Sequence, residues 1–186
     1  MLTTLPNLLT LSRILAMPLV VATFYLPEPL GPWAGCAIFA VAGVTDWLDG
    51  RLARAWQQQS ELGKLLDPIA DKLLVASCLL MLSADETIRG WTLFAAVIIL
   101  CREILVSGLR EYLAELRVGV PVTRLAKWKT SAQLVAVGFL VAGEAGDQVI
   151  SVVSQVGIWL LWLSAMLTLY TGYDYMRAGL RYMIEE

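Results

Sequence analysis

The chain has 186 residues, of which 58% are hydrophobic and 16% are charged, and its formal net charge is −2. A soluble domain is roughly half apolar and about a quarter charged, so this composition excludes an ordinary soluble protein. The apolar residues come in runs of about 20, the length that crosses a bilayer as a helix. We therefore expect an all-α membrane protein that has no nucleic-acid partner.

Six apolar segments are candidates for transmembrane helices, and no sustained alternation typical of β-strands separates them. In chain order they are Leu8–Tyr25, Pro32–Leu52, Leu65–Ser83, Trp91–Leu109, Ala126–Ala142 and Val149–Tyr170. A short polar and apolar stretch before the first span is expected to lie partly in the membrane interface. The first run lacks the flanks of a cleaved signal peptide, so we expect it to be retained. The whole chain, residues 1–186, is predicted to form one membrane domain.

The basic residues are distributed unevenly between the predicted turns. The turns at 26–31, 84–90 and 143–148 together hold one basic residue, Arg89, out of a total of 14 Lys and Arg. The remaining basic residues fall in the other turns or at the span ends beside them. Because basic residues collect on the cytoplasmic side of a membrane, both termini are predicted to be cytoplasmic.

Four acids in and near the second and third spans form the most informative pattern in the chain. Asp46 and Asp49 are three residues apart, and Asp67 and Asp71 are four apart. Each pair therefore shares one face of its helix. A short cytoplasmic connection between the two helices would bring the four carboxylates together at the inner edge of the membrane. Two divalent cations would balance their four negative charges.

This acid pattern suits a metal site for phosphorus chemistry. Carboxylate oxygens are the ligands that Mg²⁺ and Mn²⁺ prefer. Two such ions can stabilise both the attacking and the leaving oxygen of a displacement at phosphorus. The small residues Gly50 and Ala53 let a ligand approach the backbone, and Arg54 can pair with a phosphate. The residues also allow two alternatives: structural ion pairs with nearby Lys and Arg, or a proton or ion relay in a transporter.

A second charged pattern lies at the inner ends of the fourth and fifth spans. Arg102 and Arg110 are eight residues apart, close to one helix face, and Lys127 and Lys129 open the fifth span. These residues either bind an anionic substrate or are ordinary cytoplasmic loop charges. Glu103 and Glu111 are expected either to orient the arginines or simply to pair with them. The chain contains no histidine, so a carboxylate is the natural general base.

Two further residue types receive structural interpretations. The cysteines Cys36, Cys78 and Cys101 all lie within apolar runs. Their number and spacing favour small core residues over a disulfide framework or a metal site. An aromatic belt at the membrane surface explains the tryptophans near span ends, which are Trp33, Trp91 and Trp128.

The acid pattern also carries a resemblance to a known family. From Asp46 to Asp71 the sequence has the form D-x2-D-G-x2-A-R-x8-G-x3-D-x3-D. It matches the signature of the CDP-alcohol phosphotransferase family at every defined position. Members of that family are six-helix membrane enzymes, usually dimeric, that need Mg²⁺ or Mn²⁺. The resemblance therefore implies two metal ions per active site, a homodimer, and a bacterial cytoplasmic membrane with the active site facing the cytoplasm.

The same resemblance implies roles for particular residues. The metal ligands would be Asp46, Asp49, Asp67 and Asp71, and Asp71 would also be the general base. The residues that hold the CDP-linked lipid would be Gly50, Arg54 and Ser60 of the signature region, with Asn7 and Thr10 of the N-terminal segment.

The acceptor follows from looser similarities elsewhere in the chain. The segments Pro6–Arg13, Arg102–Glu111, Lys127–Thr130 and Tyr173–Tyr175 are similar to the branch of the family that uses glycerol 3-phosphate. The implied reaction converts CDP-diacylglycerol and glycerol 3-phosphate into phosphatidylglycerol phosphate and CMP. The phosphate of the acceptor would be bound by Arg102, Arg110, Lys127 and Lys129. Serine and inositol phosphate remain alternative acceptors, and inositol phosphate meets the same requirement for positive charge.

Overall fold

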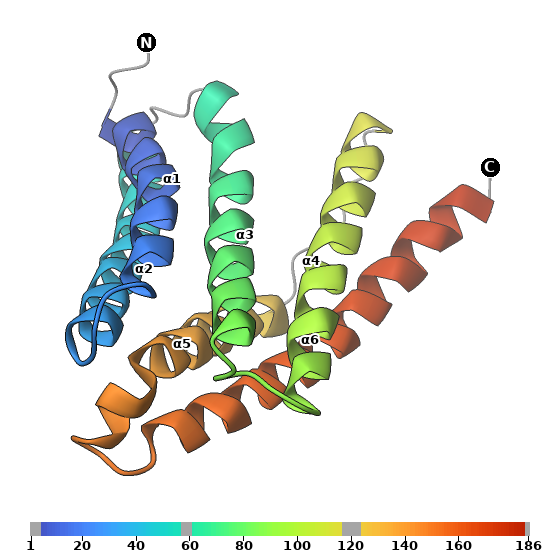
Figure 1. The fold of residues 1–186 in the computed structure, drawn as a ribbon. Helices are drawn as coiled ribbons and strands as arrows, with labels where there is room; N and C mark the ends of the chain where they lie inside the picture. The colour runs from blue at the N-terminus through green and yellow to red at the C-terminus, as the bar shows by residue number, and fades with distance from the viewer. Residues whose placement is uncertain (1–4, 57–60, 117–123, 185–186) are drawn as a thin grey trace. The chain divides into compact units, whose positions relative to one another are not determined.

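The structure, a computed structural model, describes residues 5–56, 61–116 and 124–184. Within these ranges, the side chains at 5–7, 47, 49–56, 61–62, 64–65, 115, 124–127, 178 and 180–184 fall outside the description. The described residues form six α-helices and no strand (Figure 1). The helices are α1 (Leu5–Thr23), α2 (Leu30–Trp56), α3 (Glu61–Ala84), α4 (Thr92–Glu115), α5 (Arg124–Asp147) and α6 (Val153–Ile184). The prediction of an all-α protein is thereby confirmed for this part of the chain.

Each predicted span corresponds to one helix, but the helices are longer than the apolar runs. The largest extension is in α6, which continues past the predicted end at Tyr170 to Ile184. Hydropathy marks only the apolar part of a helix, whereas backbone hydrogen bonding continues into polar flanks. In α3 the helix begins at Glu61 and runs through Pro68. In α5 the backbone leaves helical geometry at Gly143, where φ is +45° and the predicted turn begins.

The chain divides into two compact units, which we describe separately. Unit 1 comprises Met1–Ile88 and Val137–Gly157, and unit 2 comprises Arg89–Ala136 and Ile158–Glu186. Unit 1 therefore contains α1, α2 and α3, which carry the acid pattern. Unit 2 contains α4 and most of α6, together with the first half of α5, which carry the second charged pattern.

Within unit 1, α1 packs against both α2 and α3 (Figure 1). Its core includes Val20 of α1, Phe39 and Ala42 of α2, and Leu74 and Leu79 of α3, all nearly inaccessible to solvent. Phe39 and Ala42, three residues apart, share one face of α2, as expected for a helix that buries an apolar stripe. This packing places the polar residues of α1 against the acid-bearing parts of α2 and α3.

Two glycines allow the close approach of α2 to the end of α1. A Cβ atom at Gly31 would lie 2.6 Å from the carbonyl oxygen of Thr23. At Gly35 it would lie 2.6 Å from the Thr23 Oγ1 atom. A larger residue at either position would push the two helices apart, so the packing of α2 beside the end of α1 depends on both glycines.

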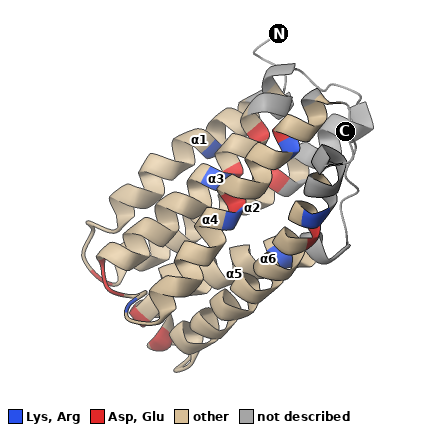
Figure 2. Cartoon of the chain, turned by 90° about the vertical axis from the view of Figure 1, so that its right-hand side faces the viewer, with Lys and Arg blue, Asp and Glu red and all other residues tan. Residues whose placement is uncertain are grey.

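Much of the apolar surface is exposed in a way that suits lipid. Two described helical segments, Thr92–Ala114 and Val153–Arg177, are long and apolar enough to cross a membrane, and two shorter apolar stretches are Leu8–Thr23 and Leu30–Asp46. The helices carry charged residues only over short stretches (Figure 2). The three tryptophans assigned to an aromatic belt, Trp33, Trp91 and Trp128, are all exposed near helix ends.

The three cysteines are free, and their environments differ. Cys78 is buried, as expected for a small core residue, and Cys36 is partly buried. Cys101 is exposed on α4, so the prediction that all three are core residues is wrong for this position. An apolar run in a membrane helix includes residues that face outward, and hydropathy alone does not separate the two faces.

Candidate active site

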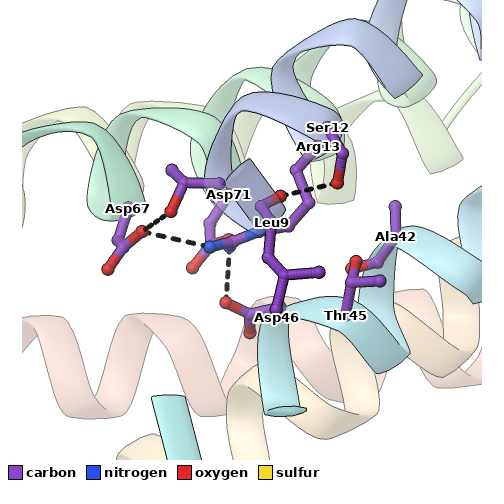
Figure 3. Close-up of polar contacts among 9 residues, drawn as sticks. Leu9, Ser12, Arg13, Ala42, Thr45, Asp46, Asp67 and Asp71 are labelled. Carbon is purple, nitrogen blue, oxygen red and sulfur yellow. Dashed lines mark hydrogen bonds and ion pairs between the residues drawn. The ribbon is translucent and has the colours of Figure 1, made fainter. Parts of the chain in front are cut away.

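Three acids of the signature converge in unit 1. Asp46 lies on α2, and Asp67 and Asp71 lie one turn apart on α3. Their side chains point toward one another around the guanidinium group of Arg13, which comes from α1 (Figure 3). The helix faces predicted from the acid spacing therefore meet, and a basic residue of a third helix lies at their meeting point. We call Asp46, Asp67 and Asp71 the acidic cluster.

The contacts of Arg13 explain how it holds the acidic cluster. Its Nη1 atom donates hydrogen bonds to Asp46 Oδ1, at 2.5 Å, and to Asp71 Oδ1. Its Nη2 atom lies 3.2 Å from Asp67 Oδ1. Charged hydrogen bonds of this kind are stronger than neutral ones, and the planar guanidinium fixes their directions. One side chain thus ties α1 to both acid-bearing helices.

Thr10 adds a second contact from α1 to the same cluster. The residue is buried, and its hydroxyl donates a hydrogen bond of 2.5 Å to Asp67 Oδ1. Thr10 and Arg13 are three residues apart and therefore share one face of α1. The N-terminal segment, of which the resemblance implied Asn7 and Thr10, reaches the acid site through this face.

Exposure differs sharply between Arg13 and the acids that it contacts. The Arg13 side chain is 1% exposed, whereas the side chains of Asp46, Asp67 and Asp71 are 39%, 46% and 50% exposed. The guanidinium contacts the Oδ1 atom of each of these acids. The acidic cluster therefore has a closed side, occupied by the guanidinium, and a side that remains accessible to a ligand.

The donor set suits a divalent metal ion. Asp46 Oδ1 and Asp71 Oδ1 both contact the Nη1 atom of Arg13, so these two carboxylate oxygens lie close to each other. Carboxylate oxygens are hard ligands of the kind that divalent metal ions prefer. As they stand, no three acidic side chains in the described part of the chain are grouped closely enough to share one ion. Arg13 lies among the carboxylates, and the Asp49 side chain is not among those described. The chemistry of the oxygens present fits Mg²⁺ or Mn²⁺.

Several predicted site residues cannot be placed. Ser60 lies outside the described residues, and only the backbone of five others is described within a helix. Those five are Asn7 of α1, Asp49, Gly50 and Arg54 of α2, and Lys127 of α5.

In unit 2 the structure brings together three of the four basic residues assigned to the acceptor. The Lys129 ammonium forms an ion pair with Glu103, and Arg102 Nη1 lies 3.6 Å from the same carboxylate. The guanidinium groups of Arg102 and Arg110 lie 5.9 and 5.5 Å from the ring centroid of Tyr175, within the range of cation–π attraction. We call Arg102, Arg110 and Lys129 the basic cluster.

Residues of α6 fix the position of Arg102 in the basic cluster, and two buried polar atoms of the cluster and its neighbour Tyr175 lack hydrogen-bond partners among the described residues. Arg102 Nη2 lies 3.0 Å from the Thr171 hydroxyl, and Gly172 leaves room for the Arg102 stem, since a Cβ atom there would lie 3.0 Å from Arg102 Cγ. Two buried polar atoms, Arg102 Nε and the Tyr175 hydroxyl, have no hydrogen-bond partner among the described residues. Buried donors normally have partners, so these two atoms lack the hydrogen bonds that buried polar groups usually make.

Comparison with known proteins decides the family. The family model of CDP-alcohol phosphatidyltransferases matches residues 3–170, which is most of the chain. The chain belongs to the CDP-alcohol phosphatidyltransferase family. The prediction of a phosphatidyltransferase, made from the acid signature, is thereby confirmed.

Named relatives in the family match nearly the full length of the chain. A protein of Rickettsia bellii is 44% identical over 178 residues, covering 96% of each chain. Relatives in Shigella flexneri, with 41% identity and 94% coverage of each chain, and in Cereibacter sphaeroides, with 36% identity and 98% coverage, are similar in the same way. All three are named CDP-diacylglycerol–glycerol-3-phosphate 3-phosphatidyltransferase.

Two residues of this phosphatidyltransferase were assigned no site role from the sequence. Arg13 counted only as a cytoplasmic-side charge, yet it is the buried partner of the acidic cluster. A basic residue within an apolar helix needs an acidic partner nearby. The position of Arg13 inside the first apolar run could therefore have predicted its contact with the acids. Tyr175 lies under both arginines of the basic cluster, but nothing in its local sequence distinguishes it from an interfacial tyrosine.

The acids do form ion pairs, although with a different partner from those considered on the sequence. Structural pairing was considered with basic residues close in sequence on α2 and α3. The contacts found are with Arg13, which precedes Asp46 by 33 residues and Asp71 by 58. Glu103, by contrast, pairs with Lys129 and Arg102, in accord with one of its two predicted roles.

Proposed function

We propose that this chain transfers the phosphatidyl group of CDP-diacylglycerol to glycerol 3-phosphate, releasing CMP and forming phosphatidylglycerol phosphate. The observation that carries the proposal is the convergence of three signature acids in a member of the CDP-alcohol phosphatidyltransferase family. The relatives named for this reaction match the chain over nearly its whole length, which supports the same acceptor.

The reaction is a direct displacement at phosphorus. Asp46, Asp49, Asp67 and Asp71 would hold two divalent ions, Mg²⁺ or Mn²⁺, which would supply positive charge for the diphosphate and the departing CMP. Asp71 accepts the proton of the acceptor hydroxyl, whose oxygen forms a bond to the β-phosphorus of the donor. The bond from that phosphorus to the bridging oxygen breaks, and its electron pair leaves with CMP.

The donor would be held by residues of the signature region and of the N-terminal segment. Gly50 has no side chain, so a ligand could approach the backbone there, and Arg54 and Ser60 would supply polar groups for the CDP part. Asn7 and Thr10 contribute from α1, and the hydrogen bond of Thr10 to Asp67 supports a place for this face of α1 at the donor site. The acyl chains of the lipid remain in the membrane.

The acceptor is recognised through its phosphate. Glycerol 3-phosphate carries nearly two negative charges at neutral pH, whereas serine is a zwitterion. Arg102, Arg110 and Lys129, joined by Lys127, supply a guanidinium fork and point charges for such a group. The unused Arg102 Nε donor supports this assignment.

We further propose that residues 1–186 form one catalytic domain with six membrane spans and cytoplasmic termini. The uneven distribution of Lys and Arg supports this orientation. The enzyme would lie in the bacterial cytoplasmic membrane, with its active site facing the cytoplasm, and would function as a homodimer among membrane lipids.

An acceptor screen with the purified protein tests the proposal. CDP-diacylglycerol in detergent micelles, with Mn²⁺, is offered glycerol 3-phosphate, serine, inositol or inositol phosphate, and CMP release and product lipids are measured. We expect CMP release and a new phosphatidylglycerol phosphate only with glycerol 3-phosphate. Faster transfer to inositol phosphate or serine would overturn the acceptor assignment, and no CMP release with any acceptor would overturn the proposed reaction.

A further inference from the structure

The least expected feature of unit 1 is a fully buried arginine at the centre of three acids. A buried charge is costly unless it is paired and hydrogen-bonded, and Arg13 is paired with Asp46, Asp67 and Asp71. The three carboxylates would otherwise repel one another. Arg13 therefore offsets the repulsion among the three carboxylates that it contacts.

The closed and open sides of the cluster separate Arg13 from an arriving metal ion. The guanidinium that contacts the three Oδ1 atoms is 1% exposed, whereas the carboxylate side chains are between 39% and 50% exposed. A divalent ion that reaches the exposed side shares its ligands with a positive charge already in place. Like charges at this distance repel in a partly buried site, where screening is weak.

Charge counting gives Arg13 a second effect. Two divalent ions carry four positive charges, which the four acids of the signature balance. With Arg13 included, the metal-loaded site has a net charge of +1. This positive charge favours binding of the anionic diphosphate of the donor. The same residue thus weakens metal binding and strengthens binding of the donor.

We propose that Arg13 is a built-in counter-charge of the metal site. It ties Asp46, Asp67 and Asp71 together, lowers their affinity for divalent ions, and supplies excess positive charge that helps to retain the diphosphate of the donor. The inference rests on the proposed metal-dependent function. It adds to that function a residue that lowers the affinity for metal ions and raises the affinity for the donor.

The test measures two affinities in the full-length purified protein. Mn²⁺ binding is titrated by electron paramagnetic resonance without nucleotide, and CDP binding is measured by calorimetry at saturating Mn²⁺. Arg13→Met is expected to bind Mn²⁺ about tenfold more tightly, equivalent to about 1.4 kcal/mol, and CDP about tenfold more weakly. Arg13→Lys keeps the charge and should stay within threefold of the wild type for Mn²⁺. The exposed Arg89→Met change, in the turn before α4, is the matched control and should alter neither affinity.

Opposite changes in the two affinities support the proposal, because a merely structural role would weaken both. Unchanged or weaker Mn²⁺ binding in Arg13→Met would overturn it, as would Arg13→Lys behaving like Arg13→Met. If Arg13→Met is stable only with Mn²⁺, the metal has replaced the counter-charge, as proposed. Instability even in saturating Mn²⁺ would count against the proposal. Absence of Mn²⁺ binding by the wild type would instead refute the proposed metal-dependent function.

Discussion

The acidic cluster of unit 1 and the basic cluster of unit 2 are built in the same way with opposite charge. In unit 1 three carboxylates surround one guanidinium. In unit 2 Lys129 and Arg102 share one carboxylate, Glu103, while Arg110 joins Arg102 at the ring of Tyr175. In each cluster a single opposite charge pairs with its neighbours without neutralising the whole group. The remaining charge indicates the ligand: cations for the acidic cluster and an anionic phosphate for the basic cluster.

The two clusters also differ in which partner is buried. In unit 1 the lone Arg13 is buried and the acids are half exposed. In unit 2 the Lys129 side chain is only 5% exposed and Arg102 only 10%, while Arg110 is exposed. A ligand therefore has several accessible groups in the acidic cluster, but Arg110 is the most accessible charge of the basic cluster. The predictions below test this contrast.

Metal removal should have the largest effect. Excess chelator is expected to abolish CMP release, and added Mg²⁺ or Mn²⁺ should restore it, because the carboxylates need divalent ions to act on a diphosphate. The measurement is the initial rate of CMP release before and after chelation. Full activity in excess chelator would show that the acidic cluster does not work through metal ions.

Asp71→Asn should come next. The change keeps the size of the side chain but removes the proposed base and one ligand charge, so turnover should fall by about 10²–10⁴-fold. CDP-diacylglycerol binding should survive better than in Asp46→Asn. Steady-state kinetics and donor binding measured on both variants separate the two roles. Near-normal turnover of Asp71→Asn would remove Asp71 as the base.

Arg110→Ala should have a smaller and more selective effect. Loss of the accessible cation of the basic cluster is expected to raise the KM for glycerol 3-phosphate by about tenfold, or about 1.4 kcal/mol. The KM for CDP-diacylglycerol should change much less. Arg89→Ala removes a charge outside the cluster and is the control. A variant that loses affinity for the donor alone would assign Arg110 to the donor site.

Asp147→Asn should have the smallest effect, since this acid belongs to neither cluster. Hydrogen bonds from the Ser154 side chain and backbone N–H hold the pKa of the Asp147 carboxyl below its usual value. Any stabilisation from these bonds is present above about pH 4 and is lost as the pH falls through the lowered pKa. At neutral pH we expect turnover and Mn²⁺ affinity within twofold of the wild type. A large loss of Mn²⁺ affinity would show that isolated acids contribute as clustered ones do.

The helices and the acid faces were predictable from the sequence because both depend on local periodicity. Asp67 and Asp71 share a face wherever an α-helix forms, and the structure confirms that the helix includes both. The partner of the acids was not predictable in this way. Several basic residues lie closer in sequence to Asp46 than Arg13 does, and only the packing of α1 against α2 and α3 selects Arg13.

The basic cluster shows a different limit of sequence reasoning. Arg102 and Arg110 are also explained by the ordinary excess of basic residues on the cytoplasmic side. What distinguishes them is the ring of Tyr175, more than 60 residues further along the chain, over which both guanidinium groups lie. Such long-range contacts depend on tertiary structure, which local spacing does not encode.

Counting the Mn²⁺ ions bound by the purified protein tests the central contrast most directly. We predict two saturable ions per chain in the wild type, weakened or lost binding in Asp67→Asn, and unchanged binding in Arg110→Ala. This result would assign the metal ions to the acidic cluster alone. Absence of saturable Mn²⁺ binding, or equal binding by the wild type and Asp67→Asn, would contradict the account.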